Sequence, residues 1–346
     1  MTWQPQSLPA DHPSVASGRV GVLIVNLGTP AAPTTSAVRR YLAEFLSDRR
    51  VVEIPAIIWQ PILRGIILNV RPKKSAHAYS QVWTEDGSPL AAITMRQAEA
   101  LAERLAGEGV VVDWAMRYGE PSIPRQLQAM MDKGCERIVL APLYPQYSGA
   151  TTATVMDKAA DALRAMRWQA SLRVMPPYHD EPLHIAALAE DIGAQLDALD
   201  FEPEVLLLSF HGMPKRTLEL GDPYHCHCMK TARLLGDALR ASGMRPAMRL
   251  RTTFQSRFGP AKWLEPATDT VIAEEAANGT RRLAIAAPGF SADCLETLEE
   301  LAIRGREQFV DECGGEHFAA LSCLNDKPVG IDMLEALIRR ELAGWI

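Results

Sequence analysis

The chain lacks the short motifs that mark the commonest nucleotide-dependent and hydrolytic enzymes. Its 346 residues contain no Walker A pattern, no GxGxxG after a strand and no GxSxG, which serve P-loop phosphate binding, dinucleotide binding and serine hydrolysis. It also lacks an excess of basic residues, because 36 Lys and Arg stand against 42 Asp and Glu, for a net charge of −6. Nucleic-acid binding requires a basic surface, so we expect no nucleic acid as a partner.

Long apolar runs are missing as well. Residues 1–18 have no basic segment followed by an apolar one, which argues against a secretory signal, and we expect a flexible leader there. The most apolar stretch, residues 54–70, is interrupted by two prolines and an arginine and falls short of the ~20 apolar residues that span a bilayer. Two interpretations stay open for this stretch. It is either a buried helix, or an exposed apolar lip with a basic rim over 54–75 that is suited to an apolar ligand or a membrane surface.

Cysteine is sparse, and its spacing is not typical of a structural metal site. The six cysteines lie in a large chain without an export signal, so free thiols in a reducing, cytoplasmic compartment are expected. The run His225-Cys226-His227-Cys228 has no second, separated pair of ligands of the kind that structural zinc needs. Metal binding there stays open, but the start of a helix after Asp222-Pro223 is favoured.

What the chain does contain is a regular alternation of short β-rich runs and amphipathic stretches. Strands are expected at 20–25, 110–115, 137–143, 171–174, 205–210, 248–253 and 282–287, and helices at 90–106, 123–133, 152–166, 182–199, 227–242, 269–278, 295–311 and 330–346. This alternation predicts an α/β protein with parallel sheets covered on both faces. Two series of strands indicate two doubly wound, Rossmann-like domains, at 19–165 and 166–329, with a cleft between them.

Polar residues that could do chemistry follow two strands of the second series. His211 comes directly after the strand at 205–210, and Glu296 begins the helix after the strand at 282–287. Carboxyl ends of parallel strands meet at one edge of a sheet, so the two side chains can converge. Imidazole and carboxylate together form an open site for a borderline metal ion. Glu300, four residues after Glu296, shares its helix face and can extend the site.

Six segments, taken in order, resemble the motifs of ferrochelatases. They are GVLIVNLGTP at 21–30, GSPL at 87–90, YPQYS at 144–148, LSFHGMP at 208–214 with GDPY at 221–224, TFQSRFG at 253–259 with WL at 263–264, and DCLETL at 293–298. The resemblance runs from about residue 21 to the C-terminus. It implies an enzyme, a lyase of haem biosynthesis, that inserts Fe²⁺ into protoporphyrin IX, releases two protons and yields haem.

The resemblance also assigns roles to single residues. His211 and Glu296 match the facing active-site pair, which with Glu300 would hold iron or manage the pyrrole protons. The porphyrin pocket would be lined by Leu27, Ser88, Arg117, Tyr118, Tyr147, Gln255 and Phe290. The macrocycle would enter through the lip at 54–75, which could also touch a membrane surface transiently, on the inner face of the membrane. The fold implied is of the chelatase type, with helix 330–346 returning to the first domain.

Two departures from the family pattern limit what is carried over. Cys294 stands where some relatives have a histidine two residues before the glutamate, which puts a histidine proton relay in doubt. The chain has no C-terminal cysteine-rich run, and Gly149 stands where a cluster cysteine can occur, so no iron–sulfur cluster and no cofactor beyond the substrate Fe²⁺ are expected. A porphyrin or haem carrier, and a chelatase for another tetrapyrrole or metal, remain as alternatives, and oligomeric state is left open.

Overall fold

The computed structural model describes residues 18–243, 247–259 and 261–346, and nearly all of the expected leader lies outside them. Within these described residues, eight strands form two four-stranded sheets in which every pair is parallel. The first sheet contains β1 (Arg19–Gly28), β2 (Val111–Tyr118), β3 (Cys135–Pro142) and β4 (Ser171–Val174); the second contains β5 (Val205–His211), β6 (Arg249–Gln255), β7 (Arg282–Ala286) and β8 (His317–Ala320). The α/β class and all seven expected strands are confirmed, and β8 is an addition.

Both sheets have the same strand order, β2-β1-β3-β4 and β6-β5-β7-β8. In each sheet the first strand of the half is central, and its residues are almost entirely buried. Apolar residues dominate both central strands because both of their faces are covered. The chain is therefore built from two topologically equivalent halves.

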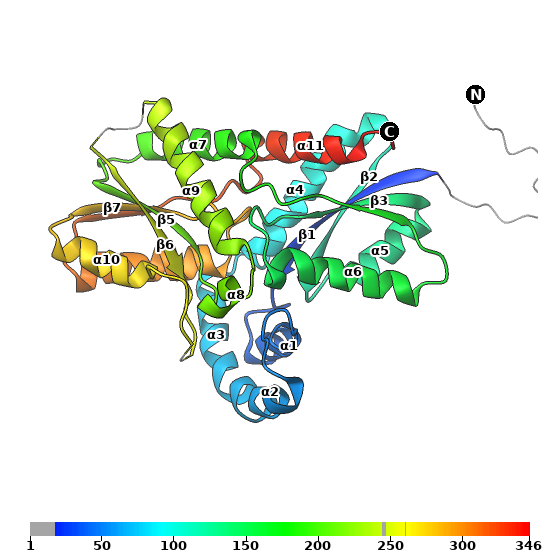
Figure 1. The fold of residues 1–346 in the computed structure, drawn as a ribbon, viewed down its shortest axis with the longest axis horizontal. Helices are drawn as coiled ribbons and strands as arrows, with labels where there is room; N and C mark the ends of the chain where they lie inside the picture. The colour runs from blue at the N-terminus through cyan, green and yellow to red at the C-terminus, as the bar shows by residue number, and fades with distance from the viewer. Residues whose placement is uncertain (1–17, 244–246, 260) are drawn as a thin grey trace, which may run out of the picture.

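The helices cover the sheets in two layers and extend beyond the first half (Figure 1). The first half holds α1 (Thr35–Phe45), α2 (Ala56–Ile62), η1 (Leu63–Ile67), α3 (Leu68–Val82), α4 (Pro89–Leu105), η2 (Ala106–Glu108), α5 (Ile123–Asp132), η3 (Gly149–Ala153) and α6 (Thr154–Ala165). The remainder holds α7 (Pro182–Asp197), α8 (Lys215–Glu219), α9 (Tyr224–Ala241), α10 (Thr268–Ala277), η4 (Glu296–Arg304), η5 (Glu307–Glu312) and α11 (Pro328–Leu342). Helices α1 to α3 project below the plane of the sheets in Figure 1.

One hydrophobic core runs through both halves. It joins residues of the central strands, such as Ile24 and Leu208, to the buried faces of α7, α9 and α11. In Figure 1, α7 and α11 lie end to end along the upper side of both sheets, and α11 contacts α4, α7 and β3. The opposite faces have separate cores, under α5 and α6 in the first half and under α10, η4 and η5 in the second. The shared core holds the carboxyl ends of both sheets in a fixed relation.

The segment at 54–70 is an exposed lip, so the structure decides between the two interpretations left open for it. Ile57 is 85% exposed and Val70 is 73% exposed, and Ile54, Ile58, Ile62 and Ile66 are exposed beside them. Leu63 and Leu68 are buried and anchor the segment on α1 and α3. Within the residues that the structure describes, no helix is long and apolar enough to cross a membrane.

Candidate active site

His211 is the last residue of β5 and stands at the carboxyl edge of the second sheet, as the sequence predicts. Its Nδ1 lies 2.6 Å from the carbonyl oxygen of Gly212. A carbonyl can only accept, so Nδ1 carries a proton and donates, and Nε2 makes no hydrogen bond to any residue that the structure describes. The next residue must be glycine, because a Cβ at Gly212 would lie 2.5 Å from the carbonyl oxygen of Gln255. This close approach of two loops fixes the direction of His211.

Gln255 connects the histidine strand to the acidic helix. It ends β6 and pairs in register with His211. Its buried side chain accepts a 2.7 Å hydrogen bond from the Ser209 hydroxyl and donates a 3.0 Å hydrogen bond to the backbone carbonyl of Glu296. His211 and Glu296 therefore flank the same glutamine, from the strand and from the helix. This arrangement agrees with the expectation that His211 and Glu296 lie at one edge of the second sheet.

The acidic helix begins as a π-helix, η4, where the sequence predicts only a continuous helix over 295–311. Its first residue is Glu296, and Glu300 lies one turn on. Burial, and then the charge of Glu296, raise the pKa of Glu300 to about 7. The hydroxyl of Ser256 donates a hydrogen bond to the Glu300 carboxylate. The two glutamates thus form an electrostatically coupled pair, and π-helical segments recur at functional sites.

The first half faces this pair with a cation and two buried phenols. Arg71 of α3 is half-buried, and burial lowers its pKa while the charges of Glu300 and Glu296 oppose that shift. The Arg71 guanidinium lies 4.3 Å from the centre of the Phe258 ring, a cation–π contact between the lip helix and the loop after β6. Burial raises the pKa of Tyr41 and Tyr79, and the charge of Glu296 adds to it in both. Because α3 also contacts η4, these groups of the first half lie beside the acidic helix.

Leu27 and Phe290, both expected to line a pocket, belong to one apolar cluster that bridges the halves. The cluster contains Leu90 and Met116 of the first half and Cys294 of the second. Leu27 also contacts the cluster under the lip, as does Leu295. The structure therefore brings these predicted residues together between the two carboxyl edges.

Arg117 and Tyr118 are placed differently, in a closed polar network of the first half. The Arg117 guanidinium lies 2.5 Å from the Asp48 carboxylate and donates to Thr154, and the Tyr118 hydroxyl donates to Asp48 at 2.8 Å. Arg117 and Asp48 are only 9% and 11% exposed. Burial opposes ionisation of Asp48, but hydrogen bonds from Thr154, the Arg50 backbone and Tyr118, with the charge of Arg117, hold its pKa below the usual value. The sequence carries no signal for Asp48, which lies in an ordinary polar turn.

Ser88 and Tyr147 lie at the edges of this region. Ser88 is buried at the start of α4, where its side chain makes no capping hydrogen bond. The backbone N–H of Tyr147 donates to Nδ1 of His227 at 3.2 Å, and His227 stacks on His179 with ring centres 3.5 Å apart. These contacts connect the YPQYS loop to α9.

The run at 225–228 forms the start of α9, as favoured from the sequence. Its side chains separate: His225 stacks on Phe254, His227 stacks on His179, Cys226 is exposed and Cys228 is buried. Across the described part of the chain, no group of three or more His, Cys, Asp or Glu residues is placed to hold a metal ion. His211, Glu296 and Glu300 therefore do not form such a group.

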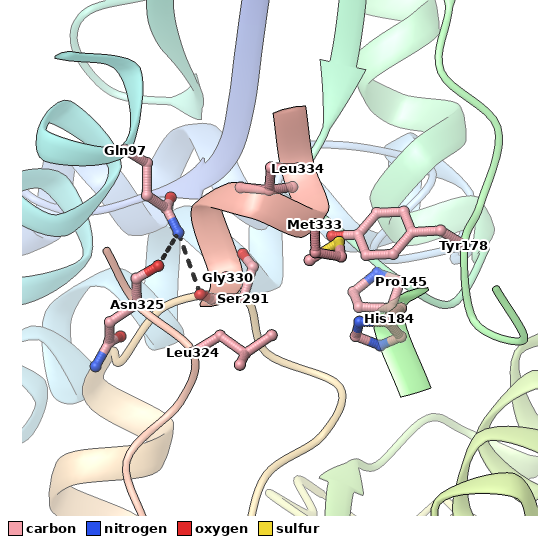
Figure 2. A pocket seen from close by; sticks show the side chains of 10 residues that line it. All are labelled: Gln97, Pro145, Tyr178, His184, Ser291, Leu324, Asn325, Gly330, Met333 and Leu334. Carbon is pink, nitrogen blue, oxygen red and sulfur yellow. Dashed lines mark hydrogen bonds between the residues drawn. The ribbon is translucent and has the colours of Figure 1, made fainter. Parts of the chain in front are cut away.

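A small cavity lies where residues of both halves meet, between Gln97 of α4, the loop at Ser291 and the start of α11 (Figure 2). Gln97 of α4 donates there to the carbonyl oxygens of Asn325 at 2.8 Å and Ser291 at 3.3 Å. The Asn325 side chain in turn donates to the Asp293 carboxylate at 2.6 Å, three residues before Glu296. This chain of hydrogen bonds fixes the loop from which η4 begins.

Comparison with known proteins agrees with the motifs. A sequence model described as Ferrochelatase matches residues 19–342. A protein named ferrochelatase from Rhizobium meliloti (strain 1021) is 53% identical over 339 residues, 97% of this chain and 98% of the relative. Another, from Methylocella silvestris, is 50% identical over 343 residues, 97% of each chain.

Solved structures show the same architecture at low sequence identity. SirB from Bacillus subtilis with Fe³⁺ has a TM-score of 0.54 at 12% identity, covering 94% of this chain and 96% of SirB. The sirohydrochlorin chelatase SirB from Bacillus subtilis subspecies spizizenii, in complex with cobalt, has a TM-score of 0.51 at 11% identity, covering 93% and 95%. These likenesses establish the fold.

Proposed function

This chain belongs to the ferrochelatase family, and from that premise we propose that His211, Glu296 and Glu300 handle the metal ion and the departing protons. The enzyme is a lyase that inserts Fe²⁺ into protoporphyrin to form haem. The observation that carries the residue assignment is the link through Gln255, which pairs in register with His211 and donates to the backbone of Glu296.

Metal insertion requires two pyrrole N–H protons to leave while a hydrated cation loses water and approaches the ring. In its neutral form the His211 ring presents an Nε2 lone pair and is suited to accept a pyrrole proton. Glu296, with Glu300 behind it, forms an anionic path along η4 that is suited to deliver the cation or to carry protons away. The iron keeps its oxidation state and no phosphate bond is broken, so the residues act without a resident cofactor or cluster.

The pocket residues provide shape. Leu27 and Phe290 supply apolar walls from opposite halves. Arg117 and Tyr118 support the first-half wall from behind, because their polar atoms are already hydrogen-bonded to Asp48. The Tyr118 ring also packs edge-on against Phe45, with ring centres 5.1 Å apart. Tyr147 is assigned to the same pocket, and the buried Ser88 and Gln255 support it from within the protein. A rigid pocket that holds the macrocycle bent favours the transition-state shape over the planar substrate.

The lip is proposed to admit the apolar macrocycle and to touch a membrane surface from the cytoplasmic side. Exposed isoleucines on α2 and η1 are followed along the chain by exposed Lys73 and Lys74 on α3. Apolar side chains combined with basic ones bind anionic lipid surfaces weakly and reversibly. A substrate dissolved in lipid could then reach the site without crossing water.

The test is anaerobic insertion of Fe²⁺ into protoporphyrin, followed by absorbance over a range of pH. His211→Ala should change the shape of the pH–rate profile and lower kcat by about 10²–10⁴-fold, the usual contribution of a general base. Exposed His77→Ala is the matched control and should leave the profile unchanged. An unchanged profile in His211→Ala would refute the base assignment, and stoichiometric binding without turnover in the parent would favour a carrier.

A further inference from the structure

Ser256 has an unusual backbone conformation beside the acidic helix. Its φ is +66°, in the left-handed region that residues with a Cβ rarely adopt. It directly follows β6, at the point where the chain leaves the second sheet. Strained residues of this kind persist where the surrounding structure holds them, and they cluster at functional sites.

The Ser256 hydroxyl donates to the Glu300 carboxylate. Within the described ranges of the chain, it is the one side chain that hydrogen-bonds to that carboxylate. The other charged groups that act on Glu300 are Glu296, Glu299 and Arg304 of η4 and Arg71 of α3. Glu299 and Arg304 pair with each other at 2.7 Å, so they do not fix the direction of Glu300.

The residues on either side of Ser256 hold neighbouring parts of the same site. Gln255 donates to the backbone of Glu296, and the Phe258 ring lies under the Arg71 guanidinium of the lip helix. The segment 255–258 thus holds the acidic helix at two points and contacts the lip at a third. A left-handed turn at Ser256 is what allows successive side chains of one short segment to reach these separate targets.

We propose that Ser256 is a positioning residue for iron insertion, whose hydroxyl holds the Glu300 carboxylate in the orientation in which it acts with Glu296 on the metal ion. The proposal rests on the role proposed above for Glu300. It assigns the backbone strain at Ser256 to function, since a glycine would relieve the strain but lose the hydroxyl.

Three substitutions separate the hydroxyl from the backbone. Ser256→Gly accepts a positive φ and lacks the hydroxyl, Ser256→Ala lacks the hydroxyl and keeps the strain, and Ser256→Asn tolerates the left-handed region and keeps a donor. Insertion into protoporphyrin is measured with Fe²⁺ under anaerobic conditions, at varied metal and at varied porphyrin. Melting temperatures report folding.

Ser256→Gly is expected to lower kcat/KM for Fe²⁺ about tenfold, the value of a hydrogen bond to a charged group, with KM for porphyrin unchanged. Its melting temperature should equal or exceed that of the parent, Ser256→Ala should lose both activity and stability, and Ser256→Asn should recover part of the activity. A purely structural serine would instead give changes that follow the melting temperature, which would overturn the proposal.

A double-mutant cycle with Glu300→Gln tests whether Ser256 acts through Glu300. In the Glu300→Gln background, Ser256→Gly should cause no further loss, and full additivity would overturn the proposal. If Glu300→Gln alone leaves kcat/KM for Fe²⁺ unchanged, the role proposed for Glu300 fails. If Glu300→Gln lowers it and Ser256→Gly does not, only the positioning proposal fails.

Discussion

The two halves of the molecule share one strand order but use the ends of their strands differently. In the first half, Arg117 and Tyr118 end β2 and turn their polar atoms inward, onto Asp48. In the second half, His211 ends β5 with an Nε2 that no described residue hydrogen-bonds, and the residues after β7 lead into the helix of Glu296. In the function proposed above, the closed first half provides walls, whereas the second half provides the reactive groups.

Buried carboxylates show the same difference in their energetics. Asp48 is compensated by an arginine and by hydrogen bonds, and its pKa is lowered. Glu300 is buried next to another carboxylate, and its pKa is raised to about 7. A paired carboxylate stabilises the fold in its ionised form, while a crowded one destabilises it. Replacing each acid by its amide should therefore act in opposite directions.

The largest effect is expected for Asp48→Asn. Loss of the buried charge leaves Arg117 unpaired and should cost about 3–5 kcal/mol of unfolding free energy at pH 7, measured by urea denaturation. Because the folded pKa of Asp48 is lowered, this contribution is present above the unfolded value of about 3.9 and is lost as pH falls through the folded pKa. The cost should shrink in acid.

The matched control is Asp157→Asn, which breaks an ion pair with Arg50 in which both side chains are about half exposed. It should cost less than about 1 kcal/mol. Equal costs for the two substitutions would contradict the idea that the first half is closed around Asp48.

Gly28→Ala should have the next largest effect. A Cβ at Gly28 would lie 1.9 Å from the carbonyl oxygen of Tyr118, so β1 and β2 would have to separate at their ends, at a cost of about 1–3 kcal/mol. Gly87 also has a positive φ but has nothing within 4 Å of its Cβ position. Gly87→Ala therefore reports only the backbone strain of a positive φ. In thermal denaturation Gly87→Ala should lower the melting temperature less than Gly28→Ala does. A larger decrease for Gly87→Ala would mean that the ends of β1 and β2 are not tightly packed.

Glu300→Gln should act in the opposite sense and stabilise the protein by about 1–2 kcal/mol above pH 7. The folded pKa is raised, so the folded state loses stability as pH rises from the unfolded value of about 4.3 to about 7, and glutamine removes that loss. No gain is expected near pH 4. Glu307→Gln, on the exposed side of the same helical region, should change nothing at either pH; a destabilising Glu300→Gln would show that the carboxylate is paired as Asp48 is.

The smallest effect concerns the lip of the first half. The Ile57→Ser and Val70→Ser double variant should bind anionic phospholipid vesicles about tenfold more weakly in a sedimentation assay, because less apolar surface enters the interface. Met156→Ser, at an exposed methionine on α6, is the control. Equal vesicle binding by the parent and the double variant would refute the proposed membrane contact of the lip.

The strands and most helices could be predicted because their apolar runs are local and strong. The strand β8 was missed because its four residues are short and only partly buried, and α1 was missed although Thr34 supplies a capping hydroxyl. The π-helical form of η4 has no separate signature, since its residues also suit an α-helix. Whether 54–70 would be buried depended on what packs against it, which no local pattern contains.

The site could be predicted in part for a similar reason. His211 and Glu296 follow recognisable strands, and topology alone places strand ends together. Asp48 and Arg117 meet across 69 residues of sequence, and Ser256 and Glu300 across 44. Such pairs depend on tertiary packing. A positive φ at a serine also cannot be predicted from the residue type, whereas a glycine suggests it.

The most direct test of the central claim, that His211 and Glu296 form one site, is a double-mutant cycle on iron insertion. We predict that His211→Ala and Glu296→Gln each lower kcat/KM by at least about 10²-fold, and that the double variant is little worse than the weaker single variant, because residues that act as a unit are not additive. Losses that multiply in the double variant, or full activity in either single variant, would contradict the account.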